Sequence, residues 1–242
     1  MDKTYTEPFR FRQFDIYHDR CTMKVGTDGV LLGAWAPVEG VQRALDIGTG
    51  SGVIAIMLAQ RMADGTVAGI DIEESAAQQA AENMRRSKWS ERLQAEHVSL
   101  QKYAAARPEP FDLVVSNPPF FTGGTLSENQ DRHAVRHAVK LSHGDLLHGV
   151  QKVLKPSGRF ALILPLIEGM RFREMAESYG FYTCRLTEVC ARPHKPVERL
   201  LLCFSRRPVS QVVESRLVIQ ESKGERWTEA YRQLTGAFYL RD

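Results

Sequence analysis

Short apolar runs rich in β-branched residues alternate along most of the chain with longer stretches of helical pattern. The runs that we expect as strands are residues 43–47, 66–70, 93–98, 111–116, 159–164, 181–189 and 199–205. The stretches that we expect as helices are residues 53–62, 73–88, 142–154 and about 168–179. Strands that alternate with helices require right-handed crossovers and a parallel sheet covered on both faces. The last two strands follow each other without a helix, so they are most simply antiparallel neighbours.

This pattern predicts an α/β fold: a Rossmann-like, doubly wound sheet of about seven strands whose last strand is antiparallel. No repeat, low-complexity tract or linker divides the chain, so we expect one globular domain over residues 41–242. Residues 1–40 are expected to form a short cover segment. In it, Thr27 or Asp28 would cap an apolar helix over residues 29–36 that lies across the ligand-binding edge of the sheet. A cover without any further role is the alternative.

Composition excludes several classes of protein. The chain has 242 residues, of which 43% are hydrophobic and 25% charged, as in ordinary globular proteins. No apolar run approaches the ~18 residues of a membrane helix, and the first ten residues are polar and charged, so we expect neither membrane insertion nor secretion. The four cysteines lack CxxC spacing, and cysteines and histidines show no zinc-ligand spacing. We therefore expect a cytoplasmic monomer with free thiols and no metal.

A glycine-rich turn with the spacing GxGxG, residues 46–52, follows the first strand. A dinucleotide site would show GxGxxG, and the carboxylate of Asp46 would tend to repel a pyrophosphate. That carboxylate suits a ligand with an ammonium or sulfonium group. Asp71, directly after the second strand, can accept both ribose hydroxyls of an adenosine. S-adenosylmethionine, a cation that carries adenosine, meets both requirements, whereas a purely structural turn and a helix-capping aspartate are the alternative.

The sequence DIGTGSG at residues 46–52, followed by Asp71, resembles the class I S-adenosylmethionine-dependent methyltransferases over roughly residues 44–205. The resemblance implies a seven-stranded Rossmann-like sheet and Asp71 on the ribose. It also implies Gly48, Gly50 and Gly52 beneath the methionyl part of the cofactor. Members of this family often carry an aspartate near the adenine after the third strand. Ser99 stands at that position here, and we count it with the cofactor site.

The loop after the fourth strand reads Asn-Pro-Pro-Phe-Phe, residues 117–121. The side-chain oxygen of Asn117 and the carbonyl of Pro118 can accept both hydrogens of one planar amino group. This contact frees the nitrogen lone pair for in-line attack on a sulfonium methyl, with positioning and electrostatics supplying most of the rate. Phe120 can stack on a flat substrate, and we count Pro119 and Phe121 as substrate-binding. A loop whose aromatic residues belong only to the core is the alternative.

The tetrapeptide NPPF resembles the (N/D)PP(Y/F/W) signature of amino methyltransferases. Members of that group methylate adenine N6, guanine N2 or a glutamine amide nitrogen in protein. The resemblance therefore implies the type of nitrogen and leaves the substrate open.

Charge separates the two halves of the chain. Residues 1–121 carry 13 Lys/Arg against 16 Asp/Glu, a balance of −3, whereas residues 122–242 carry 19 against 13, a balance of +6. A basic half is typical of a protein with a polyanionic partner. Arg132 and Arg136 follow the NPPF loop, and Arg192 and Lys195 join the last two strands, so all four could meet phosphates of a folded RNA. A solvated basic surface is the alternative for each cluster.

The stretch FRQFDIYHDRCTMKVGTDGVLLGAWA, residues 11–36, resembles the bacterial tRNA(Val) adenine-N6 methyltransferase family, and so does the ending AFYL after EAY. The resemblance implies methylation of the adenosine just 3′ of the anticodon. It also implies that Lys24 and Thr27 contribute to the cofactor site, because the KVGTD stretch lies near the cofactor in that family. The partner expected is tRNA, with no DNA and no membrane. The aromatic stripe at residues 227–238 is expected to be core.

Three other functions stay open at this point. A protein glutamine-N5 methyltransferase shares the NPP(Y/F) sequence but usually brings a helical N-terminal domain, for which about 40 residues are too few. An rRNA guanine-N2 methyltransferase would differ only in its product nucleoside. A catalytically silent RNA-binding module is expected to have lost the Asn-Pro-Pro acceptors, which this chain keeps.

Overall fold

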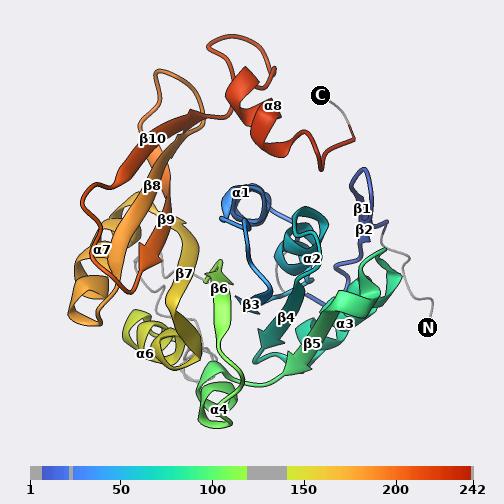
Figure 1. The fold of residues 1–242 in the computed structure, drawn as a ribbon. Helices are drawn as coiled ribbons and strands as arrows, with labels where there is room; N and C mark the ends of the chain where they lie inside the picture. Colours follow the sequence, from blue (N-terminus) through green and yellow to red (C-terminus); the bar gives the residue numbers. More distant parts are fainter. Residues whose placement is uncertain (1–6, 22–23, 119–140, 241–242) are drawn as a thin grey trace, which may run out of the picture.

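The computed structural model describes residues 7–21, 24–118 and 141–240, and an eight-stranded sheet lies at its centre (Figure 1). The strand order is β10-β8-β9-β7-β6-β3-β4-β5. The strands are β3 (Arg43–Ile47), β4 (Thr66–Asp71), β5 (Leu93–His97), β6 (Phe111–Ser116), β7 (Leu154–Pro165), β8 (Tyr182–Cys190), β9 (Val197–Ser205) and β10 (Val213–Val218). Neighbouring strands are parallel except β9, which runs antiparallel to both β7 and β8. The predicted doubly wound α/β fold, with its last expected strand antiparallel, is confirmed.

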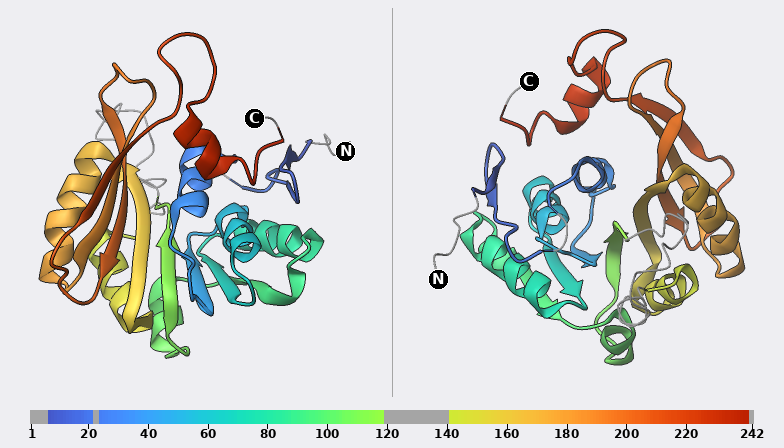
Figure 2. Two further views of the ribbon diagram at one scale, coloured as in Figure 1. Left: turned by 45° about the horizontal axis from the view of Figure 1, so that its top comes forward. Right: turned by 180° about the vertical axis from the view of Figure 1, so that it is seen from behind.

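Helices cover both faces of this sheet (Figures 1 and 2). One face carries α1 (Thr27–Trp35), α2 (Val53–Arg61), α3 (Glu74–Arg86) and α8 (Glu229–Thr235). The other face carries α4 (Leu100–Ala105), α6 (His143–Val153) and α7 (Leu166–Ser178). Successive strand residues point to opposite faces, so Ala44 belongs to the first core and Leu45 to the second. This explains why the strands read as continuous apolar runs.

A small hairpin ties the N-terminal segment to the C-terminal one. It consists of β1 (Phe9–Arg10) and β2 (Asp15–Ile16), and the backbone N–H of Arg12 donates to the carbonyl of Phe238 at 2.7 Å. The two segments lie side by side in Figure 1. Tyr231 and Phe238 are 2% and 1% exposed, which confirms that the aromatic stripe near the C-terminal helix is core.

Several elements differ from those expected. The sheet has eight strands, not seven, because β10 is an edge strand whose only buried residue is Leu217, so it shows no apolar run. The strand expected at 159–164 begins at Leu154, directly after α6, and contains an irregularity where it pairs with β6. The short helix α4 and the hairpin β1–β2 were not expected. The predicted cap of the first helix is wrong: Gly26 is the N-cap, without a side-chain hydrogen bond, and Thr27 and Asp28 lie inside α1.

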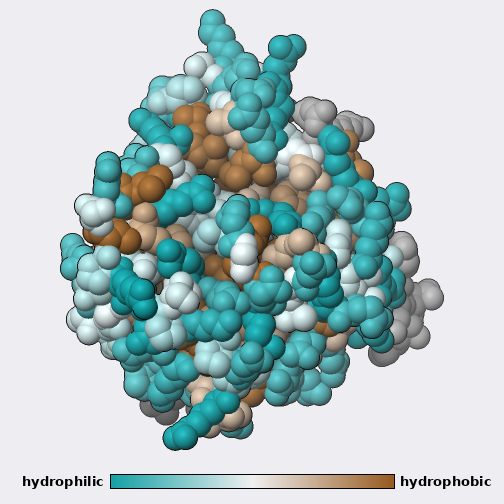
Figure 3. Space-filling view, viewed as in Figure 1, coloured by the Kyte–Doolittle hydropathy of each residue, from teal (hydrophilic) through white to brown (hydrophobic). Residues whose placement is uncertain are grey.

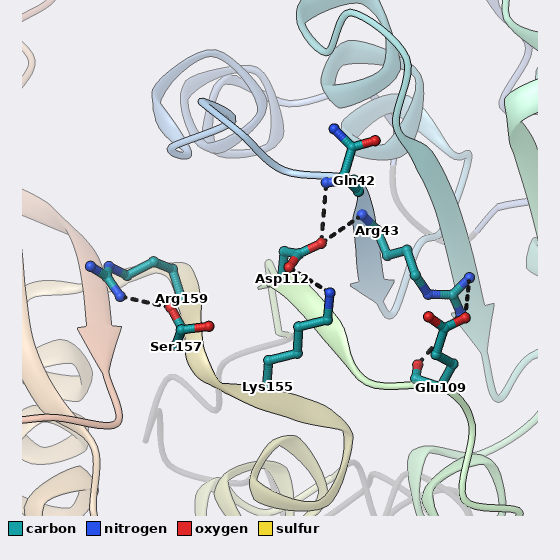
Figure 4. A network of polar contacts seen from close by, with 7 residues as sticks. All are labelled: Gln42, Arg43, Glu109, Asp112, Lys155, Ser157 and Arg159. Carbon is teal, nitrogen blue, oxygen red and sulfur yellow. Dashed lines mark hydrogen bonds and ion pairs between the residues drawn. The ribbon is translucent and has the colours of Figure 1, made fainter.

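At the amino ends of the central strands, Asp112 joins three elements (Figure 4). Its Oδ2 accepts from the backbone N–H groups of Gln42 and Arg43, at 3.1 and 3.0 Å, and its Oδ1 accepts from Nζ of Lys155 at 2.8 Å. Partial burial alone would raise the pKa of Asp112, but these donated hydrogen bonds and the charge of Lys155 lower it. This carboxylate therefore pins β3, β6 and β7 together at the edge opposite the cavity described below.

The surface in Figure 3 is mainly hydrophilic, with hydrophobic residues in separate patches. Among the described residues, no helix is both long enough and apolar enough to cross a membrane.

Candidate functional site

A cavity of about 530 Å³ opens at the carboxyl ends of the central strands. One part of its described lining comes from the start of α1, the segment before it and the turn after β3. The other part comes from Asn117 after β6, the carboxyl ends of β8 and β10, and the start of β9. The lining residues are Lys24, Val25, Gly26, Thr27, Asp28, Gly29, Leu31, Gly48, Thr49, Gly50, Ser51, Val53, Ile54, Asn117, Val189, Ala191, Glu198, Arg199 and Ile219. This is where ligands bind in open α/β sheets.

The glycine turn between β3 and α2 has two kinds of glycine. Gly48 and Gly50 have φ of +71° and +55°, and a Cβ added at either would meet nothing within 4 Å. Both glycines line the cavity, so the backbone is open to a ligand there. Gly52 has a φ of +81° and is not among the described lining residues. A Cβ added there would lie 3.3 Å from Ala80 of α3. Gly52 thus lets α3 pack close to the turn.

Asp46 lies under this turn, fully buried and outside the described lining of the cavity. Its Oδ2 accepts from Oγ1 of Thr49 at 2.7 Å, and the part of the chain that the structure describes supplies no side-chain donor to its Oδ1. Burial raises the pKa of Asp46 to about 7, against the opposing effect of the Thr49 hydrogen bond, and the nearby charge of Asp71 adds to the rise. The carboxyl group expected to face the ligand directly therefore supports the turn from below.

Asp71 and Ser99 stand at the carboxyl ends of β4 and β5, as expected, and neither is in the described lining. Oδ2 of Asp71 accepts from the N–H of Gly50 at 2.9 Å, and Oδ1 accepts from the N–H of Glu73 at 2.9 Å. Asp71 thus fixes the glycine turn. Ser99 caps α4 by accepting from the N–H of Lys102 at 3.3 Å.

Asn117 lines the cavity at the end of β6, directly beside the glycine turn. The Oγ–H of Ser116 donates to the carbonyl of Ile47 at 2.9 Å, which joins the ends of β6 and β3. Oδ1 of Asn117 is buried, and no hydrogen bond to it is found within residues 7–21, 24–118 and 141–240. A buried amide oxygen without a donor is costly, so its position in a cavity wall is typical of a ligand-binding acceptor. Pro118 is buried behind it and outside the described lining.

The remaining predicted residues divide into three groups. Lys24 and Thr27 line the cavity, as the sequence predicted. Arg192 and Lys195 lie in the β8–β9 loop, next to the lining residue Ala191, and do not line the cavity themselves. Pro119, Phe120, Phe121, Arg132 and Arg136 lie outside the described residues.

Sequence reasoning missed Asn83 of α3, which is 1% exposed. Its Nδ2 donates to the carbonyls of Tyr17 and Ser51, both at 2.8 Å, and its Oδ1 accepts from the N–H of Tyr17 at 3.0 Å. One turn earlier, Oε1 of Gln79 accepts from the N–H of Arg20 at 3.2 Å. The two amides hold residues 17–20 beside the glycine turn, just before the segment that lines the cavity. Their i, i+4 spacing among the alanines of the buried face of α3 was the available signal.

Sequence reasoning also missed the far wall of the cavity. Val189 and Ala191 come from the end of β8, Glu198 and Arg199 from the start of β9, and Ile219 follows β10. Among the residues that the structure describes, no group of three or more His, Cys, Asp or Glu side chains is placed to hold a metal ion.

Comparison with known proteins gives the class. Residues 30–164 match the family model "Methyltransferase small domain". The fold is similar to that of a predicted O-methyltransferase of Agrobacterium tumefaciens, with a TM-score of 0.70 at 17% identity, covering 87% of this chain and 96% of the other. The sequence is 41% identical over 233 residues to the tRNA1(Val) (adenine(37)-N6)-methyltransferase of Serratia proteamaculans, covering 96% of this chain and 89% of the relative. It is also 41% identical to the enzyme of that name from Bacteroides fragilis, covering 96% and 98%.

Fold, glycine turn and family match together define a class I methyltransferase. Within this class, the chain belongs to the family of tRNA1(Val) (adenine(37)-N6)-methyltransferases. The fold class, the family and the cofactor expected from the sequence, S-adenosylmethionine, are thereby confirmed.

The site fits this cofactor. Gly48 and Gly50 leave a bare stretch of backbone with open space above it. Oδ1 of Asn117 lies in the wall beside the turn, with no hydrogen bond to it among the described residues, so this acceptor suits a ligand with N–H groups. The volume of the cavity falls in the range of small-molecule and cofactor sites.

Proposed function

We propose that this chain transfers a methyl group from S-adenosylmethionine to the exocyclic N6 amino group of an adenosine in tRNA. The target we propose is adenine 37 of tRNA1(Val), the substrate in the names of its relatives. The observation that carries the proposal is the buried Oδ1 of Asn117, which lines the same cavity as the glycine turn and accepts no hydrogen bond from the described residues.

The glycine turn is proposed to hold the cofactor, which when bound supplies an electrophilic methyl group on a sulfonium. Gly48 and Gly50 let the backbone approach its methionyl part. Lys24 and Thr27 contribute from the other wall, and Gly52 acts by letting α3 pack against the turn. Asp71 holds the N–H of Gly50, and its carboxylate is proposed to accept hydrogen bonds from the ribose. Ser99, after the next strand, is proposed for the adenine side of the cofactor. Asp46 supports the turn from beneath.

Asn117 is proposed to orient the amino group that is methylated. Its Oδ1 accepts one N–H hydrogen of that group, and the main-chain carbonyl of Pro118 accepts the other. With both hydrogens held, the nitrogen is drawn toward tetrahedral geometry, which releases its lone pair from conjugation with the ring for attack on the methyl group. The chain needs no strong base for this step, because the proton leaves after the N–C bond has formed. Phe120 is proposed to stack on the adenine, with Pro119 and Phe121 beside it.

Basic side chains around the cavity are proposed to bind the phosphates of tRNA. Arg192 and Lys195 stand in the loop next to Ala191, which supports a role at the rim. Arg132 and Arg136 are proposed for the same role from their place in the sequence. Residues 1–40 are proposed to act as a cover that completes the cofactor site, and residues 41–242 as the methyltransferase domain. We propose that the enzyme works as a monomer in the cytoplasm, where tRNA takes part in translation.

The test is methyl transfer from labelled cofactor to tRNA that lacks the modification, followed by mass spectrometry of the nucleosides. N6-methyladenosine at the position 3′ of the anticodon of the valine tRNA is the expected product. N2-methylguanosine in ribosomal RNA, label in protein at a glutamine amide, or binding of RNA with no transfer to any of the three substrates would each contradict the proposal.

A further inference from the structure

The order of the strands divides the cavity into two parts. Asn117 follows β6, and the sheet continues from β6 to β3, β4 and β5 on one side and to β7, β9, β8 and β10 on the other. The glycine turn, Asp71 and Ser99 all follow strands of the first side. A cofactor held by them extends away from β9. The space between Asn117 and β9 is therefore left for the substrate.

The antiparallel direction of β9 brings its first residues to this same edge. Arg199 pairs with Pro165 at the carboxyl end of β7, and Val197 pairs with Cys190 at the carboxyl end of β8. The start of β9 thus faces the cavity, in line with the ends of the parallel strands.

Four charged side chains stand in the described lining, and none of them belongs to the glycine turn. These side chains are Lys24 and Asp28, at and before the start of α1, and Glu198 and Arg199, at the start of β9. The side chain of Arg199 is 32% exposed, so its guanidinium is accessible from the cavity while its position is constrained.

Arg199 and Asp28 form an ion pair that joins the two walls. Nε of Arg199 donates to Oδ2 of Asp28 at 2.9 Å, and one Nη donates to the carbonyl of Glu198 at 3.1 Å. A half-exposed ion pair of this kind contributes little to stability. It does fix the direction of a planar guanidinium, which is the group best suited to hold a phosphate.

We propose that Arg199, oriented by Asp28, binds the phosphate of the target nucleotide when the adenine enters the cavity. This inference rests on the proposed function, because the nucleotide is the substrate named there. Arg199 is a substrate-binding residue in this scheme and Asp28 a positioning residue. The contact anchors the backbone at one end of the substrate space, with Asn117 at the other.

The test compares Arg199→Ala with the wild-type chain and with Arg85→Ala, which removes an exposed arginine of α3 outside the cavity. Three quantities are measured: the cofactor Kd, the KM for unmodified tRNA, and the slope of log Kd for tRNA against log salt concentration. Arg199→Ala should raise the KM for tRNA about tenfold and reduce the salt slope by about one, as expected for one lost phosphate contact. The cofactor Kd should stay within about twofold of the wild-type value, and Arg85→Ala should change none of the three.

Asp28→Asn supplies a second test, since it keeps the shape of the side chain and removes the charge that orients Arg199. It should raise the KM for tRNA by a smaller factor than Arg199→Ala, and combining the two changes should add little to the effect of Arg199→Ala alone. If Arg199→Ala does not fold, the same three quantities are measured for Arg199→Gln, which keeps a hydrogen-bond donor for Asp28 and removes the charge.

Two failures are distinguishable. If the wild-type chain does not methylate tRNA, the proposed function is wrong. If it does, and the Arg199 variant keeps the wild-type KM or the wild-type salt slope, the phosphate contact is wrong while the proposed function stands.

Discussion

Asp112 and Asp46 stand at opposite edges of the same sheet, and their surroundings differ. Asp112, whose side chain is 23% exposed, accepts two backbone N–H groups and the ammonium of Lys155. Asp46 is fully buried and accepts from Thr49 at 2.7 Å, while the backbone N–H of Ala55 also favours its ionised form. The pKa of Asp112 is lowered, while that of Asp46 is raised to about 7.

The difference separates an edge that holds strands together from an edge that binds a ligand. Among the described residues, buried side-chain atoms without a hydrogen-bond partner occur at both edges, Nε of Arg43 at the amino edge included. Such an atom points to a ligand only where it also faces the cavity, and Oδ1 of Asn117 does so. The substitution of Asn117 at the carboxyl edge should therefore lower turnover more than stability, and the substitution of Asp112 at the amino edge should lower stability more than turnover.

The largest effect is expected from Asn117→Ala. Turnover should fall by about 100-fold or more, as for the loss of one preorganised polar contact to the reacting group. The cofactor Kd should stay within about twofold of wild type, because the glycine turn is untouched. Steady-state kinetics and calorimetric titration check this. A loss of less than about threefold in turnover would show that Asn117 does not orient the reacting amino group.

Asp112→Ala is the matched change at the amino edge. It leaves two backbone N–H groups and Lys155 without their acceptor, so the free energy of unfolding should fall by about 2–3 kcal/mol. Turnover at a temperature where the variant is folded should equal that of wild type. Urea unfolding and steady-state kinetics on the same sample measure the free energy of unfolding and the turnover. If Asp112→Ala loses as much turnover as Asn117→Ala, the amino edge is not limited to a structural role.

Asp46 makes stability depend on pH. Its pKa of about 7 in the folded chain lies above the ordinary value of 3.8, so the unfolded chain ionises first and stability is lost as pH rises from about 4 to 7. Asn resembles the neutral carboxyl group. Relative to Asp46→Asn, the wild-type chain should therefore lose about 2 kcal/mol of unfolding free energy between about pH 5 and pH 7. Urea unfolding of both chains at a series of pH values measures this difference, and parallel curves would mean that the pKa of Asp46 is not raised.

The smallest of these effects is expected from Asn83→Ala, which releases residues 17–20 from the glycine turn. The cofactor Kd should rise about tenfold, together with a loss of about 1–2 kcal/mol in unfolding free energy. Gln78→Ala is the control, because Gln78 is exposed on the same helix and bonds to Glu74. Asp112→Ala is the second control: if a comparable loss of stability there raises the cofactor Kd equally, Asn83 has no specific role in the site.

How far the sequence predicts the fold depends on burial. β3 and β6 begin and end at the expected residues, because both of their faces are buried and the apolar run is the strand. β10 shows no such run, since five of its six residues keep some exposure at the edge of the sheet. The pairing of β10 with β8 is a tertiary contact that local pattern does not reveal.

In the site, too, features carried by local sequence were predictable and tertiary contacts were not. The glycine turn and Asn117 were predictable, because each is a short local sequence whose residue types carry the chemistry. Asn83 bonds to a segment 66 residues away, and Arg199 bonds to Asp28 at a separation of 171 residues, so local sequence does not reveal either partner. Asp46 and Asp71 were predicted as ligand contacts, and their hydrogen bonds within the turn became visible only in the folded chain.

The reversed direction of β9 has a consequence for redesign. One β-hairpin, β8 with β9, delivers both Val189 and Arg199 to the cavity, while the strands that carry the glycine turn lie elsewhere in the sheet. If Arg199 contacts the substrate as proposed, changes confined to that hairpin are expected to alter which molecule is bound and to leave the glycine turn intact.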